Sequence, residues 1–280
     1  MPINLSLLSP SSIGDYAACS QRLVFDSQYG KPFGSSPHAD FGTVCHYWTQ
    51  YILGTDPKDE PSDQTIASAR TLPEFTGKSE EKFTNAVAAC AKKAKDNLPG
   101  LPQGITWVAE AKTYDRSLLP TRIGRKGEVS GFGGNIDLLR SDRTELWDLK
   151  FVGRPPDKVR MAYVWQLGSY HILSKVPITG ILFTTRDARW SGTLKIDWRT
   201  PLMASMARNI DGFIRACELV NFEKHAYPVA GDHCYFCEHK HRCPAQQLPA
   251  LSTRLSIDLP PVGDPNWLAS LQAQAKGNVL

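Results

Sequence analysis

A pair of short strands near the middle of the chain constrains the fold more than any other feature. Residues Asn135–Leu139 and Glu145–Phe151 are rich in apolar side chains and are separated by the polar turn Ser141-Asp142-Arg143. This arrangement is typical of a β-hairpin. Side chains alternate between the two faces of a strand. Asp148 and Lys150 are therefore expected on one face, while the residues between them point into a core.

Helical and strand patterns around this hairpin predict an α/β fold. Apolar residues recur at helical spacing in five segments, which are 11–23, 41–53, 79–97, 162–174 and 201–222. Further strands are expected at 105–114, 179–185 and 193–198. The polar stretch 56–72 and the Gly/Pro/Ser-rich stretch 29–39 are predicted as loops. The order of helices, strands, helix, strands and helix favours an α/β core with helical additions over a regular doubly wound sheet.

The same pattern divides the chain into four parts. Residues 1–104 form an expected N-terminal helical region, and residues 105–200 form the core that contains the hairpin. Residues 201–245 carry a long helix and a cysteine-rich segment. Residues 246–280 are a tail rich in proline and leucine, with a short amphipathic stretch at Asp264–Ala275.

The hairpin brings two acids together. Asp137 lies eleven residues before Asp148, on the partner strand, so both carboxylates can share a cation. Neighbouring carboxylates repel, and a divalent metal relieves that repulsion. A lysine at position 150 can orient an attacking water or stabilise negative charge on a phosphate. This chemistry suits phosphodiester hydrolysis. The alternative is a surface hairpin whose charges face water, because a motif this short occurs freely.

Charge and hydropathy bound the possible partners and compartment. The formal net charge is +4 with a pI near 8.6, which is compatible with a nucleic-acid partner but does not require one. No apolar run approaches the roughly 18 residues of a membrane span, and no basic residue precedes the first apolar residues as in a signal peptide. We therefore expect an intracellular, cytoplasmic protein whose seven cysteines are metal ligands and free thiols.

Three of these cysteines, Cys234, Cys237 and Cys243, form a C-x-x-C-x(5)-C group near the C-terminus. Three thiolates leave a tetrahedral site incomplete, and Cys19 is the candidate for the fourth. A zinc site could instead use a nearby histidine, such as His239 or His241. A thioredoxin-like redox pair would need a different context. Spacing alone leaves zinc and an iron–sulfur cluster as open alternatives.

Four motifs, taken in order, resemble the RecB-type branch of the PD-(D/E)XK nuclease superfamily. They are Gly42 to His46, Gly134-Asn135-Ile136-Asp137, Asp148-Leu149-Lys150 and the pair Gln166-x-x-x-Tyr170 on the following helix. The resemblance implies a restriction-endonuclease-like core, which is a mixed sheet flanked by helices. A mild departure is Phe151, where threonine or serine often follows the lysine. Glu110 falls near a position where the family often has another acid.

The resemblance also implies roles for these residues. His46, Asp137, Asp148 and the carbonyl of Leu149 would hold Mg²⁺ or Mn²⁺. Lys150 would activate the nucleophile, and Gln166 and Tyr170 would position the lysine or the DNA strand.

The cysteines extend the resemblance to iron–sulfur nucleases over about Leu7 to Pro244. A Tyr-x-x-Cys near the N-terminus combined with a C-x-x-C-x(5)-C group after the core is similar to CRISPR-associated single-strand exonucleases, the AddB nuclease domain and phage relatives. By this resemblance a [4Fe–4S] cluster (in some members [2Fe–2S]) joins the N- and C-terminal helical segments as a structural staple. Its ligands would be Cys19, Cys234, Cys237 and Cys243.

The activity implied by the resemblance is a DNA exonuclease that acts on single-stranded ends, with 5′→3′ polarity favoured. Partners would be DNA and, in a recombination or CRISPR adaptation complex, other proteins. Three alternatives remain at this point. One is a non-catalytic iron–sulfur DNA-binding subunit of such a complex, another is a redox or electron-transfer protein, and the third is a zinc-stabilised nuclease.

Overall fold

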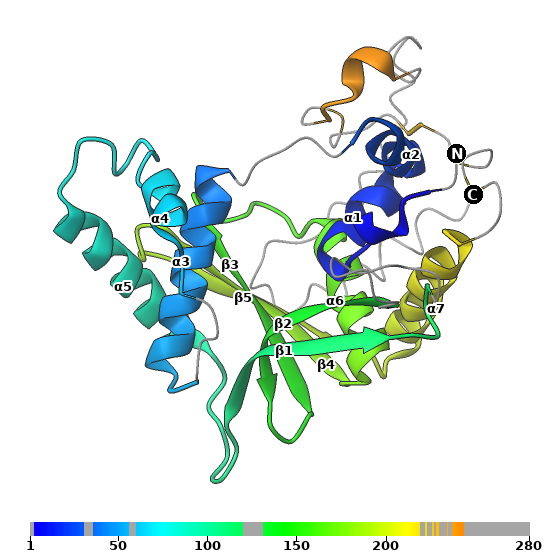
Figure 1. Cartoon of the computed structure of the whole chain (residues 1–280). Helices are drawn as coiled ribbons and strands as arrows, with labels where there is room; N and C mark the ends of the chain where they lie inside the picture. Colours follow the sequence, from blue (N-terminus) through cyan, green and yellow to red (C-terminus); the bar gives the residue numbers. More distant parts are fainter. Residues whose placement is uncertain are drawn as a thin grey trace.

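A five-stranded mixed sheet runs through the centre of the protein in the computed structural model (Figure 1). Its strands lie in sequence order and are β1 (Trp107–Asp115), β2 (Phe132–Arg140), β3 (Glu145–Val152), β4 (Ile178–Thr185) and β5 (Ser191–Asp197). The structure describes residues 3–30, 36–55, 60–119, 131–218, 222, 226, 228–229, 234 and 237–243.

One parallel pair interrupts an otherwise antiparallel sheet. β3 and β4 are parallel, and the remaining neighbours pair antiparallel. A parallel pair needs a crossover connection, and helix α6 (Met161–Ser174) provides it. The crossover places α6 against the sheet immediately after the strand that carries Asp148 and Lys150.

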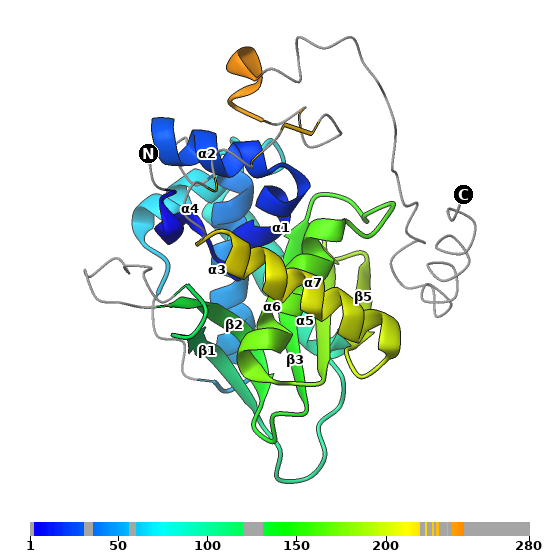
Figure 2. The same ribbon diagram turned by 90° about the vertical axis from the view of Figure 1, so that its right-hand side faces the viewer.

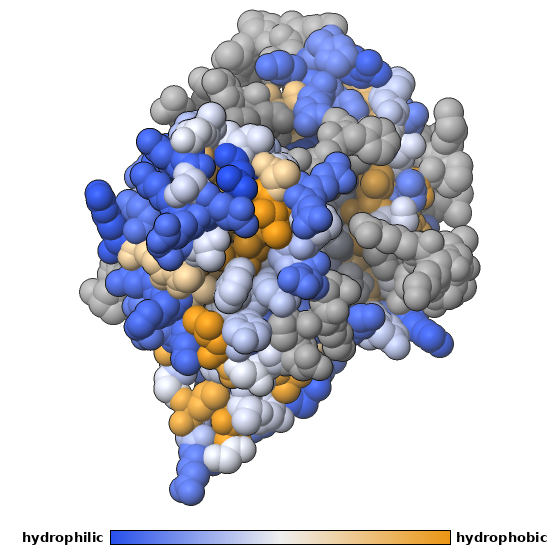
Figure 3. All heavy atoms as spheres, turned by 60° about the vertical axis from the view of Figure 1, so that its left-hand side comes forward, coloured by the Kyte–Doolittle hydropathy of each residue, from blue (hydrophilic) through white to orange (hydrophobic). Residues whose placement is uncertain are grey.

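Helices cover both faces of the sheet (Figures 1 and 2). On one face, α3 (Pro37–Ile52), α4 (Asp63–Ala69) and α5 (Glu80–Asn97) enclose a core with apolar residues of β3. Figure 3 brings this side forward and shows hydrophilic side chains over its outer layer. On the other face, α1 (Pro10–Ala18) and α7 (Pro201–Ala216) pack with α6 around a second core.

Two short pieces complete the described elements, and these are the 3₁₀ turns Leu5–Leu7 and Lys240–Arg242. Within the described segments, no helix combines the length and apolar character that crossing a membrane requires.

The predicted alternation along β3 is confirmed. Trp147, Leu149 and Phe151 pack into the core beneath α3 and α5. Leu146 lies in a separate small cluster with Tyr170 of α6. The face that carries Asp148 is therefore the face towards α6, and this side chain is only 2% exposed.

Two elements differ from the sequence-based expectation. The single helix expected over 11–23 is two helices, α1 and α2 (Ser20–Tyr29), because Cys19 between them has extended backbone angles. The stretch 56–72, expected to be a loop, contains α4. The side chain of Ser62 caps this helix by accepting a hydrogen bond from the Thr65 amide, and Ala69 at its end is buried. Apolar residues are sparse in α4, so helical periodicity did not reveal it.

Other expectations fall partly outside the described residues. The helix expected over 201–222 ends at Ala216, and residues 219–221 lie outside the described ranges. The amphipathic stretch Asp264–Ala275 and the whole tail 246–280 also lie outside them.

Close packing of α1 on α6 leads to a stability prediction for Gly14→Ala. A Cβ at position 14 would lie 2.5 Å from the Cα of Ala162, a main-chain atom that cannot move aside cheaply. We expect Gly14→Ala to destabilise the fold by about 1–3 kcal/mol, the usual cost of overpacking. The midpoint of urea unfolding measures this effect.

The matched control is Gly212→Ala in α7. A Cβ at this exposed helical position would meet nothing within 4 Å. Alanine is the better helix former, so this variant should gain roughly 0.5–1 kcal/mol. Equal stability of the two variants would contradict the close approach of α1 to α6.

Candidate functional site

Asp137 of β2 and Asp148 of β3 lie together in the middle of the sheet. The two strands pair through Leu138–Trp147 and Leu139–Leu146, and the same register sets Asp137 opposite Asp148. At this level, the amide of Leu149 donates a hydrogen bond of 2.7 Å to Asp137 Oδ2. The carboxylate of one strand is thus bound by the main chain of the next. The prediction that the hairpin brings Asp137 and Asp148 side by side is confirmed.

Burial makes both carboxyl groups weaker acids than an ordinary aspartic acid. Removal from water raises the pKa of Asp137 and that of Asp148 to about 6. Lys150 partly offsets this cost, because its Nζ lies 2.8 Å from Asp148 Oδ2. The two acids in turn raise the pKa of Lys150, so this lysine is charged at neutral pH. A single ammonium group therefore faces one buried carboxyl group, Asp148, and one that is largely buried, Asp137.

His46 reaches the same point from α3. Its Nδ1 lies 3.5 Å from Asp137 Oδ2, and the ring also hydrogen bonds to the main chain of Leu149. Burial and the nearby charge of Lys150 lower the pKa of His46. The imidazole is therefore neutral at neutral pH, as a metal ligand must be. The ring also meets Phe151 edge-on, with 5.4 Å between ring centroids. Phe151, which stands where the family often has threonine or serine, therefore packs against the ring of His46.

Gln166 and Tyr170 come from α6, one helical turn apart. Gln166 Nε2 donates a hydrogen bond of 2.7 Å to Asp148 Oδ1. The hydroxyl of Tyr170 donates to the carbonyl of Asn135 at 2.8 Å, two residues before Asp137. Gln166 thus orients an acid, whereas the resemblance implied that it positions the lysine or the DNA. Tyr170 fixes α6 to β2 next to the site.

Gln50 and the conformation of Glu110 were not predicted. Glu110 lies between the β1–β2 pairs Ala109–Leu138 and Ala111–Ile136, which sets it opposite Asp137. Its φ of 48° is left-handed, a strained conformation that is concentrated at functional sites. Gln50 is buried and donates from Nε2 to Glu110 Oε1 at 2.9 Å. The spacing of four residues from His46 to Gln50 on one helix was the available signal.

This donor set fits a hard divalent cation. It offers carboxylate oxygens, a neutral imidazole and the main chain of Leu149, the ligand types that Mg²⁺ and Mn²⁺ take in proteins. Asp148 Oδ2 is buried and accepts no well-directed hydrogen bond, although Lys150 is close. Among the described residues, no three His, Cys, Asp or Glu side chains are already arranged around a single ion. The carboxylates are instead bound by Lys150, Gln166 and the Leu149 amide.

The raised pKa values predict how pH affects cation binding. Because both folded-state values of about 6 exceed the ordinary 3.8, the metal-free fold binds extra protons between these values. These two carboxyl groups therefore lower its stability as pH rises through that window. Mn²⁺ at a hundredfold excess over its Kd should stabilise the protein by about 2.7 kcal/mol near pH 8. Near pH 5, about one unit below both pKa values, protons should compete and the gain should shrink strongly.

Thermal unfolding with and without Mn²⁺ at both pH values measures this. The control is Asp137→Asn, which removes one proposed ligand and should show little stabilisation by Mn²⁺ at either pH. An equal Mn²⁺ effect at the two pH values would contradict cation binding by these carboxylates.

A second group of predicted residues lies around the break between α1 and α2. The four predicted cluster cysteines line one pocket, together with Arg22, Phe25 and Lys240; they are Cys19, Cys234, Cys237 and Cys243. Cys19 stands at the break between α1 and α2, so this break brings it to the C-terminal cysteines. His239 is not one of the lining residues, since its Nε2 lies 2.7 Å from Asp26 Oδ1.

The remaining thiols belong to the packed interior. Cys45 and Cys90 are buried in the core beneath α3 and α5, and Cys217 lies in the core on the opposite face. Burial raises the pKa of Cys45 and raises that of Cys217 to about 12, so both stay protonated. These three residues are therefore buried free thiols, in agreement with the expectation that some of the seven cysteines are not metal ligands.

Similar structures have been solved, all at low identity. They include SSO0001 (12% identity, 82% of this chain and 96% of that chain, TM-score 0.37). An alkaline exonuclease, LHK-Exo from Laribacter hongkongensis, is 13% identical (88% and 96%, TM-score 0.35). An exonuclease candidate from Eubacterium rectale is 14% identical (81% and 91%, TM-score 0.44). These likenesses are too distant to support an argument about function, and no curated protein matches the chain.

A family model covers most of the sequence. It describes the PD-(D/E)XK nuclease superfamily and matches residues 7–244. The matched range includes the sheet, both flanking helical layers, the buried acids with their lysine, and all four pocket cysteines. The protein therefore belongs to the PD-(D/E)XK nuclease superfamily.

Proposed function

We propose that this protein is a metal-dependent deoxyribonuclease that hydrolyses the phosphodiester bonds of DNA. The observation that carries the proposal is the convergence of Asp137, Asp148 and Lys150 at one buried point, with His46 and Gln166 in contact with the two acids. Nucleases of this superfamily generally use divalent metals such as Mg²⁺ or Mn²⁺. The donor set described above fits such an ion.

Each residue of the site has a distinct proposed role. His46, Asp137, Asp148 and the carbonyl of Leu149 hold the cation, which when bound supplies Lewis-acid chemistry and acidifies a water. Lys150 places a positive charge next to Asp148, where it can orient the nucleophile and stabilise charge on the phosphate. Gln166 holds Asp148 in the orientation that presents its second oxygen, Oδ2. Tyr170 fixes the helix that carries Gln166.

The specific activity we propose is exonuclease action on single-stranded ends, with 5′→3′ polarity. This follows from the likeness of the cysteine arrangement to that of iron–sulfur nucleases. The test uses oligonucleotides labelled at the 5′ or 3′ end, single- or double-stranded, beside a closed circular single strand. A 5′→3′ exonuclease releases the 5′ label first as short products and leaves the circle intact. Cleavage of the circle would refute an obligatory exonuclease.

We further propose that the four pocket cysteines hold an iron–sulfur cluster, most simply [4Fe–4S]. Four thiolates are the usual ligand set, and the pocket collects four cysteines from both ends of the described chain. Thiolates bound to different irons of a cluster lie further apart than ligands of a single ion. Among the described residues, no three His, Cys, Asp or Glu side chains are close enough together to hold one metal ion, and a cluster does not require that they be.

The zinc alternative requires a histidine in place of one thiolate. His239 is engaged with Asp26, and His241 accepts a hydrogen bond of 2.9 Å from Arg242 Nε. Both contacts favour four thiolates over three thiolates and a histidine. Iron and sulfide analysis with visible absorption distinguishes the two, because zinc is spectroscopically silent. A colourless protein that contains zinc would refute the cluster and leave the nuclease proposal standing.

A further inference from the structure

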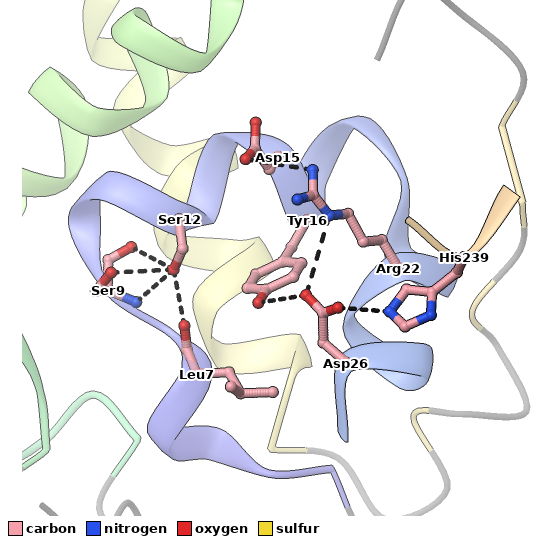
Figure 4. A network of polar contacts seen from close by, with 8 residues as sticks. All are labelled: Leu7, Ser9, Ser12, Asp15, Tyr16, Arg22, Asp26 and His239. Atoms are coloured by element: carbon pink, nitrogen blue, oxygen red, sulfur yellow. Dashed lines mark hydrogen bonds and ion pairs between the residues drawn. The ribbon is translucent and has the colours of Figure 1, made fainter. Parts of the chain in front are cut away.

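A buried polar network links the N-terminal helices to the C-terminal segment (Figure 4). Its centre is Asp26 of α2, which is 2% exposed. The hydroxyl of Tyr16 donates to Asp26 Oδ2 at 2.9 Å, and His239 Nε2 lies 2.7 Å from Asp26 Oδ1. All three side chains are more than nine-tenths buried. Arg22 adds a longer contact of 3.9 Å from its Nε to Asp26 Oδ2.

Aromatic contacts reinforce the same junction. The ring of His239 packs against Phe25 and Tyr29 of α2, with ring centroids 5.5 and 6.2 Å apart. The guanidinium of Arg242 lies over the ring of Tyr29, 4.3 Å from its centroid. His239 and Arg242 therefore attach residues 239–242 to one helix, although Asp26 and His239 are 213 residues apart in sequence. This junction contains no cysteine.

The junction and the cysteine pocket share the same two pieces of chain. α2 begins directly after Cys19, and its Arg22 and Phe25 line the pocket. His239 follows Cys237 by two residues and precedes Cys243 by four. Holding His239 on Asp26 therefore fixes two cysteines of the C-terminal segment relative to Cys19. Residues that orient metal ligands from outside the coordination sphere commonly contribute strongly to metal affinity.

We propose that Tyr16, Asp26 and His239 form an anchor that docks the C-terminal cysteine segment on α2 before any cluster is bound, so that the thiolate site is assembled in advance. Docking gives Asp26 Oδ1 its partner, His239 Nε2, and packs the His239 ring against Phe25 and Tyr29. All of these contacts would be lost if the segment left α2, which favours the docked arrangement. The anchor stands on the described contacts alone, and its consequence for a cluster rests on the proposed function.

The test uses the full-length protein prepared without iron, and trypsin as the probe. Lys240 and Arg242 are exposed cleavage sites within the docked segment. We expect the iron-free wild type to resist cleavage at these sites. Asp26→Asn and His239→Gln should each be cleaved there about tenfold faster, because each loses one partner of the buried carboxylate–imidazole contact. Mass spectrometry of the early fragments identifies the sites.

Two matched variants serve as controls. Asp15→Asn removes a carboxylate from α1 whose side chain is 49% exposed and which also contacts Arg22. His241→Gln replaces the exposed histidine two residues beyond His239. Both should be cleaved at the wild-type rate. If circular dichroism shows that Asp26→Asn has lost its helical content, His239→Gln and the milder Tyr16→Phe decide the question.

Iron reconstitution separates the anchor from the cluster. If the anchor assembles the site, Asp26→Asn should take up iron about tenfold more slowly than the wild type and lose it faster to a chelator. Equal protease resistance of the iron-free wild type and both anchor variants would overturn the anchor. If the wild type resists trypsin more than the anchor variants do but takes up no iron, the anchor is supported and the proposed cluster is refuted.

Discussion

Replacing Lys150 with methionine is expected to lower the rate of DNA hydrolysis by on the order of 10²–10³-fold. The Nζ of Lys150 lies 2.8 Å from Asp148 Oδ2, and this carboxyl group is only 2% exposed, so water cannot easily replace the lysine's charge. Methionine keeps the length of the side chain but removes the charge. The loss should appear in kcat, because the ammonium group stabilises charge that develops during the reaction.

Steady-state hydrolysis of a labelled oligonucleotide with Mn²⁺ measures this effect. The control is Lys92→Met on α5, where the lysine is exposed and pairs with Asp96. This variant should hydrolyse DNA at the wild-type rate. Unfolding curves are needed for both proteins, because Lys150→Met also leaves a buried acid without its cation. A stable Lys150→Met protein with wild-type kcat would contradict the role assigned to this lysine.

Replacing Cys237 with serine is expected to remove the proposed iron–sulfur cluster. Four thiolates bind a [4Fe–4S] unit, and serine is a poor substitute for a thiolate. Iron content should fall from about four atoms per chain in the reconstituted wild type to well below one in the variant. The thermal unfolding temperature should fall with it, because metal binding energy is also folding energy.

Cys217→Ala is the matched control. Cys217 is buried in the core near α7, away from the four-cysteine pocket, and burial keeps its thiol protonated. This variant should retain its iron and lose only the packing of one small side chain. If Cys237→Ser kept the iron content and stability of the wild type, the pocket would not be the cluster site.

Local sequence patterns predicted those parts of the fold and site that depend on short-range periodicity. The alternation along β3 separates Asp148 and Lys150 from Trp147 and Leu149, and strand geometry alone produces that separation. The spacing of Gln166 and Tyr170 likewise predicted that both lie on one face of a helix. The order of these motifs also suggested the superfamily whose model matches residues 7–244.

Features that depend on distant contacts were missed for a physical reason. Glu110 combines a left-handed backbone with a hydrogen bond from Gln50 of another element, and no local pattern encodes that pair. The pairing of Asp26 with His239 is equally invisible in sequence, since each residue alone is an ordinary polar position. The helix break at Cys19 was hidden because apolar residues continue at helical spacing across it.

The most direct test of the central claim is the Mn²⁺-dependent release of short nucleotides from labelled single-stranded DNA. Wild type is compared with Asp148→Asn, which keeps the shape of the side chain but removes the charge that the cation and Lys150 require. We predict rapid release by the wild type with Mn²⁺ and none with a chelator. The variant should release nucleotides on the order of 10²-fold more slowly than the wild type, or slower still. Equal release by both proteins, or no degradation of any DNA by the wild type, would contradict the claim.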